Sequence, residues 1–454
     1  AHLTLTIPDG WKQASALPEK STDGAPTTFE TFSFHDVVDS PLITGPHMRT
    51  INISSDNLPP VYWHIASESP GALNIDEELI EKYKNMVAEA GELFGGAHFD
   101  EYHLLLFLSD DFPNTGLEHL RSSLNGLGER DLEDQDKVDG WAGYLIPHEF
   151  AHSWCGKYRR PAGMATPDFH TDKHTNLLWV YEGLDQYLGE VLCVRAGVWS
   201  MDTYMETLAL KLSTLMHQRG RQWRSLEDTA VDAYHLRGGV PAWGNWRRGQ
   251  DYYNEGLLLW LEADAIIRAK TDNDKSLDDF CRAFMGPDLP AVAVHPHTVD
   301  DIVAILADLA DHDWRAFIRD WVEVPQDELP LTVVERLGYR IQYSAERSDR
   351  LKDSETDRKY VSAMDSLGLI VNHSGEVSGS LVPGMPAERA GLSPGQKIMG
   401  VNGRKFTADR FRDALMDSTT RRSIEFLVLD GDVFETVTIE YADGLKYSGL
   451  VRNE

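Results

Sequence analysis

His148-Glu149-Phe150-Ala151-His152 is the stretch of this sequence that carries the most chemical information. Residues four positions apart lie on one face of a helix, so the two imidazoles can bind one metal ion while Glu149 points toward the metal's water ligand. Catalytic zinc takes three protein ligands and keeps a fourth position for that water. The pentapeptide therefore predicts a zinc-binding helix. The alternative is a helix that carries two unrelated histidines.

A third zinc ligand is expected on a nearby helix. Tyr158 stands where a further histidine would be needed six residues after His152, and Thr171 stands where an acid would be needed nineteen residues after it. Thirty residues after His152, however, the sequence Leu177-Leu178-Trp179-Val180-Tyr181-Glu182-Gly183 reads as an apolar helical entry that carries a single acid, Glu182. This acid is the candidate for the third ligand.

The order of these motifs resembles the glycyl aminopeptidase family of gluzincin metallopeptidases, which join a thermolysin-like catalytic domain to a C-terminal PDZ domain. Two further segments fit the resemblance. Thr115-Gly116-Leu117-Glu118-His119 is similar to the family's substrate-amine motif, and Tyr252-Tyr253-Asn254-Glu255-Gly256 is similar to the helix that presents its catalytic tyrosine. The similarity spans roughly residues 1–450. The family's N-terminal β domain is usually longer, so this chain is expected to lack its first part.

The resemblance implies one Zn²⁺ per chain, bound by His148, His152 and Glu182. It implies that Glu149 takes the proton of the attacking water and later passes it to the leaving amine. It also implies that a tyrosine donates a hydrogen bond to the oxyanion of the tetrahedral intermediate. The reading frame relative to Gly256 favours Tyr253 for this role, and Tyr252 is the competing candidate.

The resemblance further implies that the substrates are peptides with a free N-terminus, and that small first residues such as Gly or Ala are preferred. Glu118, together with Gly116 and Leu117, is expected to bind the α-ammonium group of the first residue. Two alternatives stay open. The chain is a zinc endopeptidase if Glu118 does not face the cleft, or a catalytically silent, PDZ-based peptide-binding protein on a peptidase scaffold.

Composition narrows the remaining possibilities. The chain has 454 residues, which predicts two or three domains, and 42% are hydrophobic and 26% charged, as in folded globular proteins. The formal net charge of −30 disfavours nucleic acid as a partner, because phosphate backbones would be repelled. No apolar run approaches the roughly 18 residues of a membrane span. Because the chain starts at Ala1 without a signal sequence, we expect it to be a processed product or a fragment. The sequence therefore does not decide between the bacterial cytoplasm and the periplasm.

The sequence pattern predicts an α+β multidomain protein. We expect a partial N-terminal β domain over 1–71, an α-rich, thermolysin-like catalytic domain with a helical extension over 72–324, a linker over 325–354 and a PDZ domain over 355–454. A strand is expected at 102–108, and a helix is expected to begin near Leu79 and stop at Gly95. Further helices are expected at 141–156, 177–195, 200–217, 252–270, 299–309 (capped by Thr298) and 313–322.

The C-terminal region carries a possible second binding site. Ser366-Leu367-Gly368-Leu369-Ile370 resembles the PDZ loop whose backbone amides hold a peptide carboxylate, while the adjacent strand edge accepts the peptide as an added strand. A peptide ligand at Leu367, Gly368 and Leu369 is therefore one expectation. The other is a packing module whose groove is closed.

Overall fold

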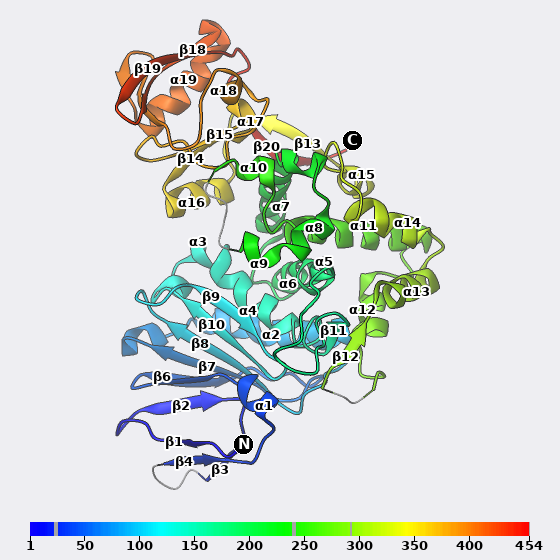
Figure 1. The fold of residues 1–454 in the computed structure, drawn as a ribbon. Coiled ribbons are helices and arrows are strands. Elements are labelled where there is room, and N and C mark those ends of the chain that lie inside the picture. The colour runs from blue at the N-terminus through cyan, green and yellow to red at the C-terminus, as the bar shows by residue number, and fades with distance from the viewer. Residues whose placement is uncertain (22–25, 238–241, 291–292, 454) are drawn as a thin grey trace. The chain divides into compact units, whose positions relative to one another are not determined.

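A computed structural model describes residues 1–21, 26–237, 242–290 and 293–453 of the chain (Figure 1). The chain divides into two compact units. The first contains residues 1–201 and 266–314, and the second contains residues 202–265 and 315–454.

The N-terminal part of the first unit consists mainly of short antiparallel strands. One small sheet has the order β1-β4-β3, and a second pairs β2 with β5. The helix α1 begins after Ser33, whose hydroxyl accepts a hydrogen bond from the Asp36 backbone. The elements are β1 (Thr4–Leu5), β2 (Lys12–Ser15), β3 (Glu19–Ser21), β4 (Thr27–Phe29), α1 (Phe34–Val38) and β5 (Leu42–Gly45).

A five-stranded sheet with the order β6-β7-β8-β10-β9 supports the candidate site. Its strands are β6 (Met48–Asn52), β7 (Val61–Ser67), β8 (Tyr102–Leu108), β9 (Thr115–Glu118) and β10 (Ser122–Leu127). β8 covers the predicted range and pairs in parallel with β7 and β10, which is consistent with its largely apolar sequence. The expected boundary after residue 71 is wrong as a structural division, because β6 and β7 belong to the same sheet as the three later strands.

Helices pack on this sheet and on one another in the first unit. α2 (Glu77–Phe94) buries the predicted apolar stripe and ends at Gly95, whose φ of 76° needs a glycine. α4 (Trp141–Ala151) contacts β9, β10 and α6 (Gly183–Arg195), as Figure 1 shows. The other elements of this unit are α3 (Gln135–Val138), β11 (Arg159–Pro161), α5 (Leu178–Tyr181), α12 (Leu277–Met285), β12 (His295–His297) and α13 (Val299–Leu309).

Two predicted helices differ from the observed ones. The helix predicted over 141–156 ends at Ala151, and the chain then turns and passes through Gly156, which has a φ of 109°. The helix predicted over 177–195 is two helices, α5 and α6, that meet at Glu182. The helix predicted over 299–309 is confirmed, and Thr298 caps it by accepting a hydrogen bond from the Asp301 backbone.

The second unit combines helices with a β-rich C-terminal part. Its helices are α7 (Met201–Met216), α8 (Leu226–Val231), α9 (Ala233–Leu236), α10 (Gly244–Arg247), α11 (Asn254–Lys270), α14 (Trp314–Val322) and α15 (Thr332–Arg336). α7, α11 and α14 match the helices predicted at 200–217, 252–270 and 313–322 to within two residues at each end. None of the helices in the described part of the chain combines the length and the hydropathy that a bilayer crossing needs.

The C-terminal domain has its own core, which includes Leu369, Ile398, Phe411 and Phe426. The expected linker over 325–354 is wrong, because that range contains α15, the strand β13, which pairs with β20, and the start of α16. The elements are β13 (Tyr339–Ser344), α16 (Asp349–Arg358), β14 (Tyr360–Ala363), α17 (Met364–Leu367), β15 (Leu369–Asn372), α18 (Pro386–Arg389), β16 (Lys397–Val401), β17 (Arg404–Lys405), α19 (Ala408–Arg421), β18 (Ser423–Asp430), β19 (Val433–Glu440) and β20 (Tyr447–Arg452).

Both edges of β15, the strand expected to accept a peptide, are hydrogen-bonded within the chain. β14 pairs with one edge in antiparallel register. On the other edge, the backbone of Ser378 donates to the Ile370 carbonyl and that of Val382 donates to the Gly368 carbonyl. An added peptide strand would have to displace one of these segments. Peptide binding at 367–369 stays a prediction.

Candidate metal centre and active site

The helix α4 carries His148 and Glu149 on an almost fully buried segment. Pro147 lies inside this helix and leaves the Gly143 carbonyl without its usual helical donor. The Cys193 thiol of α6 lies 3.7 Å from that carbonyl and donates to it. Gly189 of α6 allows close packing, because a Cβ there would lie 3.0 Å from the Cα of His148. The two helices therefore approach closely where the first histidine sits.

The two predicted imidazoles and the predicted acid converge on one point. His152 Nε2 lies 3.3 Å from Glu182 Oε2, and His148 Nε2 lies 3.9 Å from the same oxygen. Ligands about 2.0–2.2 Å from a tetrahedral ion are separated by about 3.3–3.6 Å. Glu182 reaches this position because it occupies the junction between α5 and α6. The spacing of these three atoms is close to that of a set of zinc ligands.

The opposite nitrogen of each imidazole faces protein groups. His152 Nδ1 lies 2.9 Å from the Cys155 carbonyl, which can only accept, so this nitrogen carries a proton and Nε2 is left to offer a lone pair. His148 Nδ1 lies 2.6 Å from the Tyr144 hydroxyl and 3.0 Å from Asp185 Oδ2. Partners of this kind fix the ring orientation of metal-binding histidines.

Asp185 is a second carboxylate within reach of both histidines. Its donor atoms and those of His148 and His152 all lie within 4.8 Å of one another, so this trio also fits a metal-binding group. Asp185 is 0% exposed, however, and it faces the Nδ1 atoms, whereas the Glu182 side chain is 16% exposed and faces the Nε2 atoms. A catalytic metal needs an open position for water or substrate, which favours the Glu182 side.

The charges around the two imidazoles favour a bound cation. Burial alone would lower the pKa of His152, but the carboxylates of Asp185 and Glu182 outweigh this effect and raise its pKa well above the usual value. Burial raises the pKa of Asp185 in turn. A divalent cation among these groups would balance the same negative charge, so the donor set fits zinc in both chemistry and charge.

Glu149 lies beside Gly116 of β9. A Cβ at Gly116 would lie 2.0 Å from Glu149 Oε1, so a larger residue there would displace the Glu149 side chain from its observed position. Burial raises the pKa of Glu149 to about 8, with His152 opposing that shift. Its Oε2 has no hydrogen-bond partner among the described residues. The packing thus provides a structural reason for a glycine at position 116, which the sequence motif does not reveal.

Glu118, at the end of β9, accepts a hydrogen bond from the hydroxyl of Tyr181, the residue before Glu182. Burial would raise the pKa of Glu118, but the charges of His152 and Lys157 outweigh it, so this pKa lies below the usual value. Glu118 is therefore a half-buried carboxylate next to the candidate metal ligands. Its neighbour Leu117 is 46% exposed.

Tyr252 and Tyr253 precede α11 in the second unit and have different surroundings. Tyr252 is 2% exposed, and its hydroxyl accepts a hydrogen bond from the Gln250 side chain at 2.6 Å. Tyr253 is partly exposed. Beside them, Arg221 and Arg248 both bind the buried Glu255, so the start of α11 is held by charge-assisted hydrogen bonds.

Sequence reasoning missed several residues that support the site. Tyr144 stands one helical turn before His148, and Tyr181 directly precedes Glu182. Their positions relative to the candidate ligands could have indicated that they lie at the site. Asp185, three residues after Glu182, faces the Nδ1 atoms of both histidines. Asp39 contacts the turn after Glu118 from about 80 positions away, and no sequence pattern marks it.

Two segments of the chain match sequence models of known families. Residues 142–259 match the M61 glycyl aminopeptidase family. Residues 1–46 match the Peptidase M61 N-terminal domain. The first segment includes both histidines and the predicted third ligand, Glu182. These matches support a peptidase.

Solved structures give a comparison of the fold. An aminopeptidase N family protein from Idiomarina loihiensis aligns over 100% of this chain and 77% of its own, with a TM-score of 0.78 and 19% identity. An M1 zinc metallopeptidase from Deinococcus radiodurans aligns over 72% of this chain and 63% of its own, with a TM-score of 0.43 and 14% identity. No curated protein matches the chain. The first alignment supports a mixed α/β multidomain fold of the aminopeptidase kind, and the PDZ assignment stays a prediction.

Proposed function

We propose that the chain is a zinc-dependent aminopeptidase that hydrolyses the first peptide bond of peptides with a free N-terminus. The observation that carries this proposal is the convergence of His148 Nε2 and His152 Nε2 on one oxygen of Glu182, with Glu149 on the same helix. A preference for small first residues such as Gly or Ala is part of the proposal, and the description of the matched family supports it.

In this proposal each nearby residue has one task. His148, His152 and Glu182 hold the zinc ion, and Asp185 orients the histidines from behind. The ion, when bound, supplies Lewis-acid polarisation of the scissile carbonyl and lowers the pKa of water. Glu149 accepts the proton of the attacking water and donates it to the leaving amine.

Metal content provides the first test of this proposal. We expect elemental analysis to find one zinc ion per purified chain and Glu182→Ala to lose most of it, because one of three ligands is gone. Asp185→Asn is expected to keep the site with about 10–100-fold weaker affinity, as for other groups that orient ligands. If Asp185→Asn loses the metal and Glu182→Ala retains it, the third ligand is Asp185. Absence of zinc, with no activity gained on adding it, contradicts the proposal.

Tyr253 is proposed as the hydrogen-bond donor to the oxyanion. Its partial exposure supports this choice over Tyr252, which is buried and bound to Gln250. We expect Tyr253→Phe to reduce kcat by about 10²–10³-fold with little change in KM, because the donor acts only when negative charge develops. Tyr252→Phe is the matched control. If that variant is the inactive one and Tyr253→Phe is active, the assignment is wrong by one residue.

A further inference from the structure

Asp39, at the end of α1, links three segments of the first unit. Its Oδ1 lies 2.6 Å from Lys157 Nζ and 3.3 Å from His119 Nδ1, and its Oδ2 accepts a hydrogen bond from the Leu120 backbone at 3.0 Å. His119 and Leu120 form the turn that directly follows Glu118. One carboxylate from the N-terminal segment is therefore bound both to this turn and to the Lys157 ammonium group.

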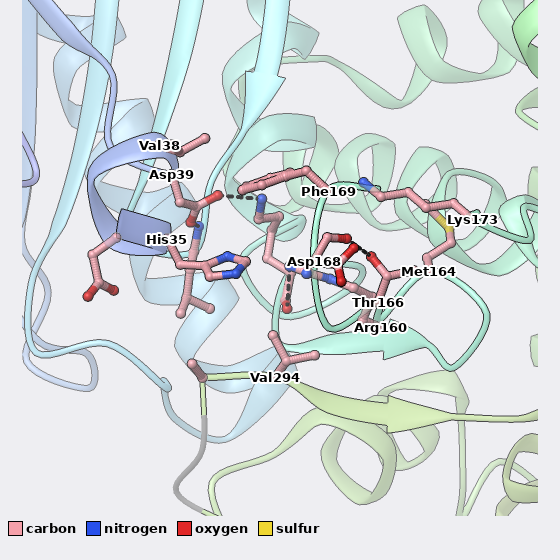
Figure 2. Close-up of a pocket in the computed structure, with 14 residues that line it drawn as sticks. His35, Val38, Asp39, Arg160, Met164, Thr166, Asp168, Phe169, Lys173 and Val294 are labelled. Atoms are coloured by element: carbon pink, nitrogen blue, oxygen red, sulfur yellow. Dashed lines mark hydrogen bonds and ion pairs between the residues drawn. The ribbon is translucent and has the colours of Figure 1, made fainter. Parts of the chain in front are cut away.

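Lys157 connects the same carboxylate to the metal-binding region. Its backbone donates to the His152 carbonyl at 3.0 Å, so the residue is anchored just after the second histidine. The ion pair lies in the wall of a cavity of about 290 Å³, and Figure 2 shows Asp39 there opposite Phe169 and Arg160. The positive charge of Lys157 also acts on Glu118 and helps to lower its pKa.

A lysine near Glu118 creates a competition that a working aminopeptidase must prevent. Under the proposed function, Glu118 binds the α-ammonium group of a substrate. The Lys157 side chain is also an ammonium group, carried on a flexible four-carbon stem. Without a partner of its own, it would be attracted to Glu118 and would oppose substrate binding. Its observed partner is Asp39.

We propose that Asp39 is a positioning residue for substrate selection, because it holds the Lys157 ammonium group and thereby keeps Glu118 available for the N-terminus of a peptide. This inference rests on the proposed function. It assigns to the N-terminal segment a role in binding the substrate, since Asp39 lies within the segment, residues 1–46, that matches a separate family domain.

The test uses the full chain and an alanyl chromogenic anilide with a free amine. Asp39→Asn is expected to raise KM about tenfold, or about 1.4 kcal/mol, with kcat changed less than about twofold. The double variant Asp39→Asn/Lys157→Met is expected to have a KM within about twofold of that of Lys157→Met alone, because the competing ammonium group is absent. A variant that only damaged the fold would not be rescued by a second substitution.

Asp36→Asn is the matched control, since Asp36 caps the same helix and binds Arg121 but does not contact Lys157. We expect its KM to stay within about twofold of wild type. An unchanged KM in Asp39→Asn, or a raised KM that Lys157→Met does not reverse, overturns the inference. If Asp39→Asn does not fold, the KM of Lys157→Met is the deciding measurement. A KM at or below the wild-type value supports the inference, and a tenfold rise in KM overturns it. Failure of the proposed function is recognised separately, because wild type would then cleave free and N-acetylated peptides equally well.

Discussion

Replacement of Glu149 by glutamine is expected to reduce kcat by about 10²–10⁴-fold while zinc stays bound. The carboxamide has nearly the same shape as the carboxylate, so the close contact with Gly116 is preserved. It cannot, however, accept a proton from water or return one to the leaving amine. The measurement is kcat on an aminoacyl chromogenic substrate, together with elemental analysis of the same preparation.

Glu190→Gln provides the control for this experiment. Like Glu149, Glu190 is a buried acid, but it lies on α6. The Gln186 side chain donates a hydrogen bond to it at 3.2 Å, and Glu190 has no role in the proposed chemistry. We expect its kcat to stay within a few-fold of wild type. If Glu149→Gln retains zinc and also retains turnover within tenfold of wild type, another group is the base and the assignment of Glu149 is wrong.

Local periodicity predicted helices around the candidate ligands, although α4 is shorter than predicted and Glu182 lies between two helices. Two histidines four positions apart need only one turn of helix to share a face, and α4 provides that turn. The strand at 102–108 and the helix capped by Thr298 were also predicted at their observed bounds, because each depends on a run or a capping residue that lies within it. Interactions between residues that are close in sequence were sufficient to predict these elements.

Contacts between distant segments were beyond sequence reasoning. The boundary expected after residue 71 failed because strand pairing across the chain, which local patterns do not encode, places β6 and β7 beside β8. The range 325–354 was taken for a linker, yet its Arg347 forms an ion pair with Glu355, which is buried. Composition alone cannot distinguish solvated charges from paired ones.

The same limit applies within the candidate site. The motif Thr115–His119 was interpreted through its acid, Glu118, and its glycine was assigned to substrate binding. The structure gives a further reason for glycine at position 116, since a Cβ there would overlap the Glu149 carboxylate in its observed position. A residue can therefore occur in a motif because a neighbour needs the space, and only the packing of β9 against α4 reveals this.

Glu118 is expected to make the enzyme strongly selective for free N-termini. An α-ammonium group loses water on entering a closed cleft, and a fixed carboxylate offsets that cost. An N-acetylated peptide would leave the Glu118 carboxylate without its cationic partner. We expect kcat/KM to be about tens to thousands of fold higher for a free peptide than for its acetylated form, which corresponds to about 2–5 kcal/mol.

Two substitutions separate the charge of Glu118 from its place in the structure. Glu118→Gln keeps a side-chain oxygen that can accept the hydrogen bond from Tyr181, but it removes the negative charge. Glu118→Ala removes both. If charge is what selects the free amine, both variants lose most of the ratio, and the loss comes from weaker cleavage of the free-amine peptide. Tyr181→Phe is the companion variant, because it removes the hydrogen bond and leaves the charge.

The outcome of these measurements distinguishes the aminopeptidase from the endopeptidase. A wild-type ratio near one means that the chain cleaves internal bonds, because a carboxylate that anchored the N-terminus would penalise its acetylation. A large wild-type ratio that Glu118→Gln leaves unchanged keeps the aminopeptidase and assigns the anchor to another acid. We expect neither, because Glu118 is a half-buried acid that accepts a hydrogen bond from Tyr181 and that the charges of His152 and Lys157 hold in its charged form. A carboxylate that is already charged and fixed binds an ammonium group without having to ionise or reorganise first.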